Sequence, residues 1–138
     1  MPRRKLILYT ILSIAAALAA GWLWGASGRF SVAEQARAAE QRADLADAHG
    51  RVLAARVSLF ESNFGNAARG LEVAKRPLER VRDRHRARGE EKAAAAVDKA
   101  LERIEAARRL AAGLDSTANA RAAEAVTLIE QLSKAPSS

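Results

Sequence analysis

Two histidines are the side chains best suited to acid–base or metal chemistry, and their neighbours do not complete a site. Asp44 and Asp47 precede His49, whereas His85 stands among arginines. On a helix the first three would spread over different faces, so they cannot converge on one metal ion. The chain has no cysteine, no H-E-x-x-H pair, no P-loop and no nucleophile elbow. We therefore predict no catalytic residue, no metal site and no cofactor, and we expect that the protein is not an enzyme.

A basic cluster between positions 75 and 88 is the one feature that suggests a ligand. Within this segment only Glu79 and Asp83 oppose its charge. Such a cluster can bind anionic lipid, an acidic protein surface or nucleic acid, and a solvated face without a ligand is the alternative. It lacks the interleaved aromatic residues that stack on bases, so nucleic acid is the least favoured ligand. The basic cluster consists of Lys75, Arg76, Arg80, Arg82, Arg84, Arg86 and Arg88.

The elements that must position these residues begin with an apolar segment, Leu6 to Trp24. It contains no charged residue, and as a helix it would roughly match the ~30 Å hydrocarbon core of a bilayer. Bases precede it, and aromatic residues lie near both ends, where they favour the headgroup region. The predicted membrane-interface residues are Arg3, Arg4, Lys5, Tyr9, Trp22 and Trp24.

The same segment could also be a cleaved signal peptide, because Ala17-Leu18-Ala19 has the small-x-small pattern of a cleavage site. We favour a retained anchor, since apolar residues continue to Trp24. Bases lie before the segment and only Arg29 follows closely, which predicts a cytoplasmic N-terminus and an exported C-terminal part. The alanine- and arginine-rich composition suggests a bacterial source, and hence a single-pass protein of the bacterial inner membrane with its C-terminal domain in the periplasm.

The remaining composition favours helix, because alanine supplies 34 of the 138 residues and there are only three prolines. We predict an all-α fold: one N-terminal transmembrane helix followed by an antiparallel bundle of four amphipathic helices. Ser31 and Glu34 match a capping box and suggest a new helix there, although one continuous helix from Leu6 onward is the alternative. The predicted segments are a basic flank at 1–5, the span at 6–24, a hinge at 25–30, the bundle at 31–133 with helices at 31–62, 66–88, 90–113 and 116–133, and a disordered tail at 134–138.

Apolar spacing predicts which face of each bundle helix is buried. In the second helix Pro77 falls inside this pattern without shifting its phase, so we expect a kink and not an end. The predicted core residues are Leu45, Val52, Leu53, Val57 and Phe60 in the first helix; Ala67, Leu71, Ala74, Leu78, Val81 and His85 in the second; Ala94, Val97, Leu101, Ile104, Ala111 and Leu114 in the third; and Ala118, Ala122, Ala125, Ile129 and Leu132 in the fourth.

The segment Asn63 to Ala74 resembles the second half of a tetratricopeptide repeat. That motif places aromatic, small, large apolar and small residues at successive offsets of three, four and three, and the residues that match are Phe64, Ala67, Leu71 and Ala74. The proline of the motif is displaced by two positions, to Pro77, and no second copy follows. The resemblance implies a protein-binding module, and an ordinary helical hairpin is the alternative.

Two hypotheses for the function follow. The first is a single-pass, membrane-anchored helical scaffold or adaptor whose exported bundle contacts protein partners or associates with itself. The second is a membrane-tethered binder of polyanions, anionic lipid or nucleic acid, which would act through the basic cluster. The side of the membrane on which the bundle lies separates them.

Overall fold

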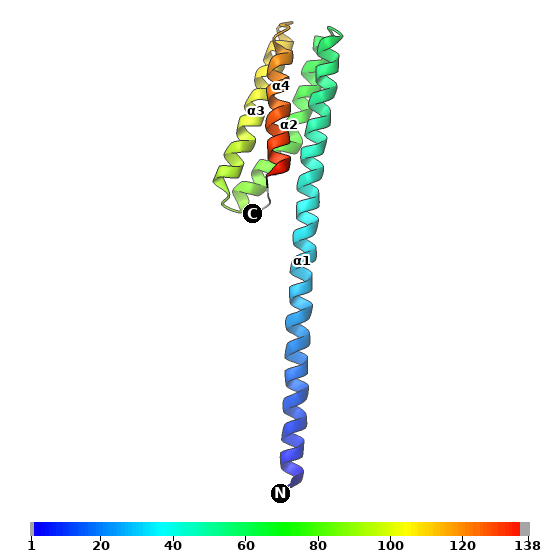
Figure 1. Cartoon of the computed structure of the whole chain (residues 1–138), viewed down its shortest axis with the longest axis vertical. Helices are drawn as coiled ribbons and strands as arrows, with labels where there is room; N and C mark the ends of the chain where they lie inside the picture. The colour runs from blue at the N-terminus through cyan, green and yellow to red at the C-terminus, as the bar shows by residue number, and fades with distance from the viewer. Residues whose placement is uncertain (1, 136–138) are drawn as a thin grey trace. The chain divides into compact units, whose positions relative to one another are not determined.

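The computed structural model describes the backbone of residues 2–135 and the side chains of residue 14 and residues 32–135. It contains four helices: α1 (Pro2–Phe60), α2 (Phe64–Ala87), α3 (Glu91–Ala112) and α4 (Ala118–Lys134) (Figure 1). No strand occurs in the backbone so described. The fold is therefore an all-α bundle, as the composition predicts. The last three helices begin and end within two residues of the ranges predicted for them.

The chain divides into two compact units, Met1–Ala38 and Ala39–Ser138. The second unit holds the last turns of α1 together with α2, α3 and α4, and it forms the bundle. Residues 25–30, where a hinge is predicted, are helical and belong to α1. Ser31 likewise lies inside α1 and not at a helix start, so the alternative of one continuous helix describes this backbone.

Membrane insertion stays a prediction. None of the helices formed by residues with described side chains is both long enough and apolar enough to span a bilayer. Apart from Ile14, the segment Leu6 to Trp24 lies outside these residues. The same is true of the predicted interface residues Arg3, Arg4, Lys5, Tyr9, Trp22 and Trp24, and residues 136–138 of the predicted tail also fall outside the described part.

The face of α2 predicted to be buried forms the centre of the core. Its buried residues include all six that the spacing predicts, Ala67, Leu71, Ala74, Leu78, Val81 and His85. The prediction for this helix is confirmed, because an uninterrupted alternation of three and four residues can face only one side of a helix. The helix also continues through Pro77, which is itself buried.

The predicted core face of α1 is partly wrong. Leu53, Val57 and Phe60 are 38%, 56% and 72% exposed. Leu45 and Val52 are buried as predicted, and the other buried positions are Ala48, Ala55, Ser58 and Leu59. This helix carries two apolar stripes, and the prediction chose the largest side chains from both. Alanine was overlooked because it has the smallest apolar surface, although its size is what allows α1 to approach α2 closely.

That close approach is visible at Gly70. A Cβ atom at this position would lie 3.4 Å from the Cβ of Ala55, in van der Waals contact, so the two helices lie close together here. Nearby, the Asn66 amide nitrogen donates to the Ser58 hydroxyl at 3.0 Å. Small and polar residues therefore join α1 to α2 at the end of the bundle where the chain first reverses.

In α3 and α4 most of the predicted core residues are buried, and alanines add to them. Ala100 and Ala107 join the core of α3, and Val126 joins that of α4. Leu101 and Leu132 are half-buried. Leu114 is 71% exposed, which contradicts its predicted place in the core. It lies beyond the end of α3, where the chain has already turned away.

Three chain reversals share one mechanism. Ser62, Gly89 and Leu114 adopt the left-handed conformation, with φ of 58°, 71° and 61°. After each of them a backbone N–H returns to a carbonyl in the last turn of the helix: Asn63 N to Ser58 O at 2.8 Å, Glu90 N to His85 O at 3.0 Å, and Asp115 N to Leu110 O at 2.9 Å. This is the Schellman arrangement, in which glycine is the favoured left-handed residue. Of the three left-handed residues, only Gly89 is a glycine.

Candidate functional site

The basic cluster of α2 is the predicted binding site, and its central arginines contact α1. Asp44 of α1 accepts a hydrogen bond from Arg80 Nη2 at 2.6 Å and another from Arg84 Nη2. The Asp44 side chain is 14% exposed. Burial alone would raise the pKa of Asp44, but the hydrogen bonds from Arg80 and Arg84 outweigh it and hold this pKa below its usual range. Asp44 is therefore a charged carboxylate held between two guanidinium groups.

The first residue of the cluster faces α3. Lys75 Nζ lies 3.0 Å from Glu105 Oε2 and 3.2 Å from Glu72 Oε2. Arg108 contacts both carboxylates, at 2.6 Å from Glu105 and 3.2 Å from Glu72. The hydrogen bond from Arg108, assisted by Lys75, lowers the pKa of Glu105 to about 2, while that of Lys75 is raised, first by its hydrogen bond to Glu105. Glu105 thus pairs with Arg108 of its own helix and with Lys75 of α2.

The later arginines also have carboxylate partners. Arg86 Nη2 lies 2.8 Å from Asp98 of α3, and Arg82 lies 2.9 Å from its neighbour Asp83 and 3.7 Å from Asp98. Because Asp98 belongs to α3, these contacts again join two helices.

The last arginine, Arg88, lies 3.3 Å from Glu90 and donates to the side-chain oxygen of Gln41 at 3.1 Å. Among the described residues, Arg76 is the one member of the cluster without a carboxylate within ion-pair distance. The cluster is therefore largely neutralised in space, partly by nearby acids such as Asp83 and partly by acids of other helices, Asp44, Asp98 and Glu105.

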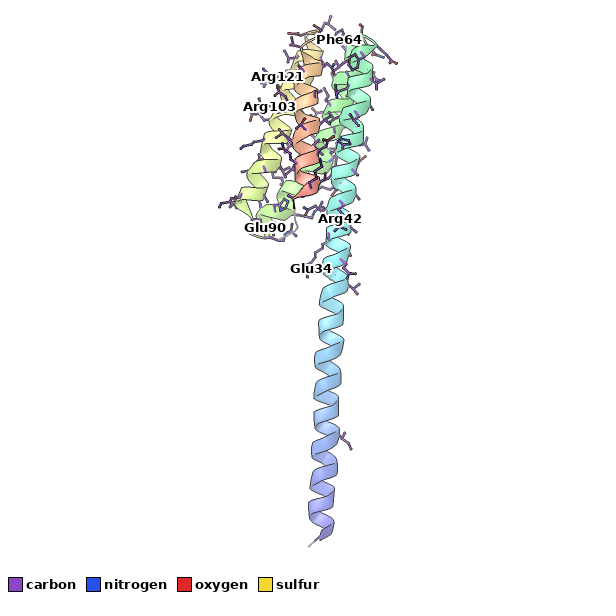
Figure 2. The ribbon with its side chains drawn as sticks, in the orientation of Figure 1. Glu34, Arg42, Phe64, Glu90, Arg103 and Arg121 are labelled. Atoms are coloured by element: carbon purple, nitrogen blue, oxygen red, sulfur yellow. The ribbon has the colours of Figure 1, made fainter. Side chains whose placement is uncertain are left out.

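The two histidines hold elements of the bundle together. His85 Nδ1 lies 2.5 Å from Oε2 of Glu90, which is labelled in Figure 2, and its Nε2 lies 3.4 Å from Gln41 Nε2. The hydrogen bond to His85 is the main cause that lowers the pKa of Glu90. His49 Nε2 of α1 lies 3.3 Å from Glu130 of α4. No group of three potential metal ligands occurs among the residues that the structure describes.

A surface groove of about 530 Å³ lies between α3 and α4. Arg103 and Arg121, labelled in Figure 2, both pair with Glu124 beside it, at 3.1 Å and 2.8 Å. The lining of the groove is mostly polar or charged, and one ion pair, Arg103 with Glu124, crosses it. It is lined by Lys99, Glu102, Arg103, Glu124, Thr127 and Leu128.

The acids that neutralise the basic cluster were missed by sequence reasoning. Asp44 lies 36 positions before Arg80, and Glu105 lies 30 positions after Lys75. Nothing in the sequence says which of several surface carboxylates will meet a given arginine across two helices. A count of charges within residues 75–88 therefore overstates the positive charge of this surface.

Comparison with known proteins found no family model, no curated protein and no solved structure that matches the chain.

Proposed function

We propose that the chain is a single-pass, membrane-anchored scaffold or adaptor that contacts other proteins on the exported side of a bacterial inner membrane. The observation that carries this proposal is the uncharged segment Leu6 to Trp24, preceded by three bases and followed by a separate helical unit. A segment of this length and polarity favours the bilayer, and the bases before it favour the cytoplasmic side. The bundle then follows on the opposite side.

An adaptor role fits the surface of the bundle. Both histidines are paired with carboxylates, His85 with Glu90 and His49 with Glu130. Large apolar side chains are exposed instead, among them Val57 and Phe60. Exposed apolar residues grouped on one face commonly mark contact with another protein. The tetratricopeptide-like segment Asn63 to Ala74 carries the same expectation.

The ion pairs of α2 weigh against the polyanion-binding alternative. An incoming phosphate or nucleic acid would have to displace Asp44 from Arg80 and Arg84, or Glu105 from Lys75. Each exchange would trade one charged hydrogen bond for another, so the net gain would be small. The cluster is better suited to holding the bundle together than to recruiting a polyanion.

Fusions to the C-terminus of the full chain test the proposal. We expect a phosphatase fusion to be active, a fluorescent-protein fusion to be dark in the exported compartment, and both to remain with membranes after carbonate extraction. A matched variant with Ile11→Arg and Leu18→Arg should release the protein from membranes, because charges near the bilayer centre are unfavourable by about 2.5–3.5 kcal/mol each. A bright, inactive and membrane-bound pair of fusions would place the bundle in the cytoplasm and favour the polyanion alternative.

A further inference from the structure

A second apolar stripe runs along α1 within the bundle unit, apart from the positions that form the core. Its seven members are separated alternately by four and three residues, none is charged, and all are exposed. The core contacts of α1 use other positions, such as Leu45 and Val52. The outer stripe of α1 consists of Ala39, Ala43, Ala46, Gly50, Leu53, Val57 and Phe60.

Gly50, in the middle of the outer stripe, has no packing role inside the chain. A Cβ atom built there would meet nothing within 4 Å, in contrast to Gly70, where the Cβ of Ala55 lies at 3.4 Å. Glycine inside a helix is less favourable than alanine by about 1 kcal/mol. A glycine at this point would allow another helix to approach this face closely. Among the described residues of this chain, no helix packs there.

We propose that the outer stripe of α1 pairs with the same stripe of a second copy of this chain, as a parallel, in-register coiled coil. Spacing of alternately four and three residues is the a/d pattern of such a pair. In this register Val57 occupies an a position and Leu53 a d position, the combination of a β-branched residue at a and leucine at d that favours two parallel strands. The smaller members, Ala43, Ala46 and Gly50, let the two helix axes approach closely.

The charges beside the outer stripe select the parallel orientation. Basic residues occupy one flank, the g positions, at Arg42 and Arg56, and acidic residues occupy the other, the e positions, at Asp47 and Glu61. In a parallel pair each g residue faces the e residue five positions later in the second copy. Arg42 then meets Asp47 of the second copy, and Arg56 meets Glu61 of the second copy. An antiparallel pair would instead bring arginine to arginine and acid to acid.

Contacts inside the chain leave these flanking groups able to reach a second copy. Arg56 donates through Nε to Asn119 at 3.0 Å, which leaves its two terminal nitrogens for another acceptor. Asp47 accepts from Arg51 through Oδ1 at 2.9 Å, and its second oxygen remains. Arg42, labelled in Figure 2, is exposed on α1. All these residues belong to the second unit, so the inference goes beyond the proposed function and does not depend on the anchor.

Single-cysteine variants of the full chain test the pairing, because the native sequence has no cysteine. Ala43→Cys and Phe60→Cys place a thiol on the outer stripe at positions about 26 Å apart along the helix. Arg51→Cys is the matched control, since this exposed residue of the same helix lies off the stripe. Upon mild oxidation in membranes we expect each stripe variant to form a disulfide-linked dimer, at least several-fold faster than the control.

The pattern of crosslinks also fixes the orientation. A mixture of the Ala43→Cys and Phe60→Cys chains should give only like-with-like disulfides. Mixed disulfides between the two would show an antiparallel pair, and crosslinking of Arg51→Cys as fast as the stripe variants would show random collision. Either result, or no crosslink from a folded stripe variant, overturns the proposal.

Charge reversal gives an independent measurement. Arg42→Glu places an acid opposite Asp47 of the other copy on both sides of the pair, and we expect it to weaken dimerisation roughly tenfold or more. The double variant Arg42→Glu with Asp47→Arg restores opposite charges and should recover the wild-type dimer, while circular dichroism checks that each monomer is folded. A double variant that dimerises no better than Arg42→Glu would contradict the assigned register.

Discussion

Asp44 in α1 and Arg80 in α2 are joined by two hydrogen bonds, because Asp44 Oδ1 accepts from Arg80 Nη2 at 2.6 Å and from Arg80 Nε at 3.1 Å. Arg84 donates to the other carboxylate oxygen. One acid of α1 thereby holds two of the seven members of the basic cluster. These two arginines therefore join α2 to α1. The number of positive charges in the cluster does not by itself indicate a ligand.

Replacing this acid should destabilise the bundle. Asp44→Asn keeps the size of the side chain but leaves Arg80 and Arg84 close together without their counter-charge. Because hydrogen bonds to charged groups contribute about 1.5–3 kcal/mol each, we expect the free energy of unfolding to fall by about 1–3 kcal/mol. Urea unfolding measures it, and Asp83→Asn, at an exposed position, is the control. Equal stability of Asp44→Asn and wild type would show that these contacts are dispensable.

Acid should weaken the contact between α2 and α3. The pKa of Glu105 is lowered to about 2 from 4.5, so its folded form binds a proton less readily than its unfolded form. Its contribution to stability is therefore fully present above about pH 4.5 and is lost as the pH falls toward 2. We expect Glu105→Gln to be less stable than wild type at pH 7, and the difference to shrink between pH 4.5 and pH 2. A difference that stays constant over this interval would argue against the ion pair.

Glycine should stabilise the turn that follows α3. Leu114 has φ of 61° and is 71% exposed, so its side chain adds little burial while its Cβ disfavours the left-handed conformation. Leu114→Gly should raise the free energy of unfolding by about 0.5–1 kcal/mol. The converse change, Gly89→Ala, should lower it by a similar amount, since Gly89 has φ of 71°. Thermal melts of both variants check this, and opposite signs to those expected would refute it.

Truncating a side chain in the core face of α2 should destabilise the protein much more than truncating one in the outer stripe of α1. Leu71 is fully buried, and we expect Leu71→Ala to cost about 2–5 kcal/mol. Val57→Ala removes a side chain that is 56% exposed in a single chain and should change the unfolding of a dilute monomer by less than about 0.5 kcal/mol. Chemical unfolding at low protein concentration makes the comparison. A large loss from Val57→Ala in the monomer would place that residue in the core after all.

Sequence reasoning succeeded where one pattern dominated a helix. In α2 the spacing from Ala67 to His85 admits one buried face, and the structure has it. In α1 two patterns overlap, and a rule that favours large residues selected Leu53, Val57 and Phe60 over Ala48 and Ala55. Packing of α2 against Ala55 through Gly70 decides between the stripes, and that contact cannot be read from α1 alone.

Among the helix ends and the ion pairs, too, some features can be predicted from the sequence and others cannot. The glycine at position 89 predicts a left-handed residue at the end of α2, because glycine adopts this conformation most readily. Ser62 and Leu114 adopt the same conformation without any such signal, since the geometry of the bundle imposes it on them. Cross-helix pairs such as Asp44 with Arg80 depend on the rotation of both helices about their axes, which apolar spacing fixes only approximately.

The proposed export of the bundle across the inner membrane is tested most directly by thiol labelling in cells. Ser116→Cys puts a single thiol in the exposed turn between α3 and α4 of a chain that has no other cysteine. We expect a membrane-impermeant maleimide to label it in cells whose outer membrane alone has been made permeable. Pro2→Cys, before the proposed anchor, should be labelled only after the inner membrane is also opened. The reverse pattern, with Ser116→Cys protected until the inner membrane is opened, would contradict an exported, membrane-anchored adaptor.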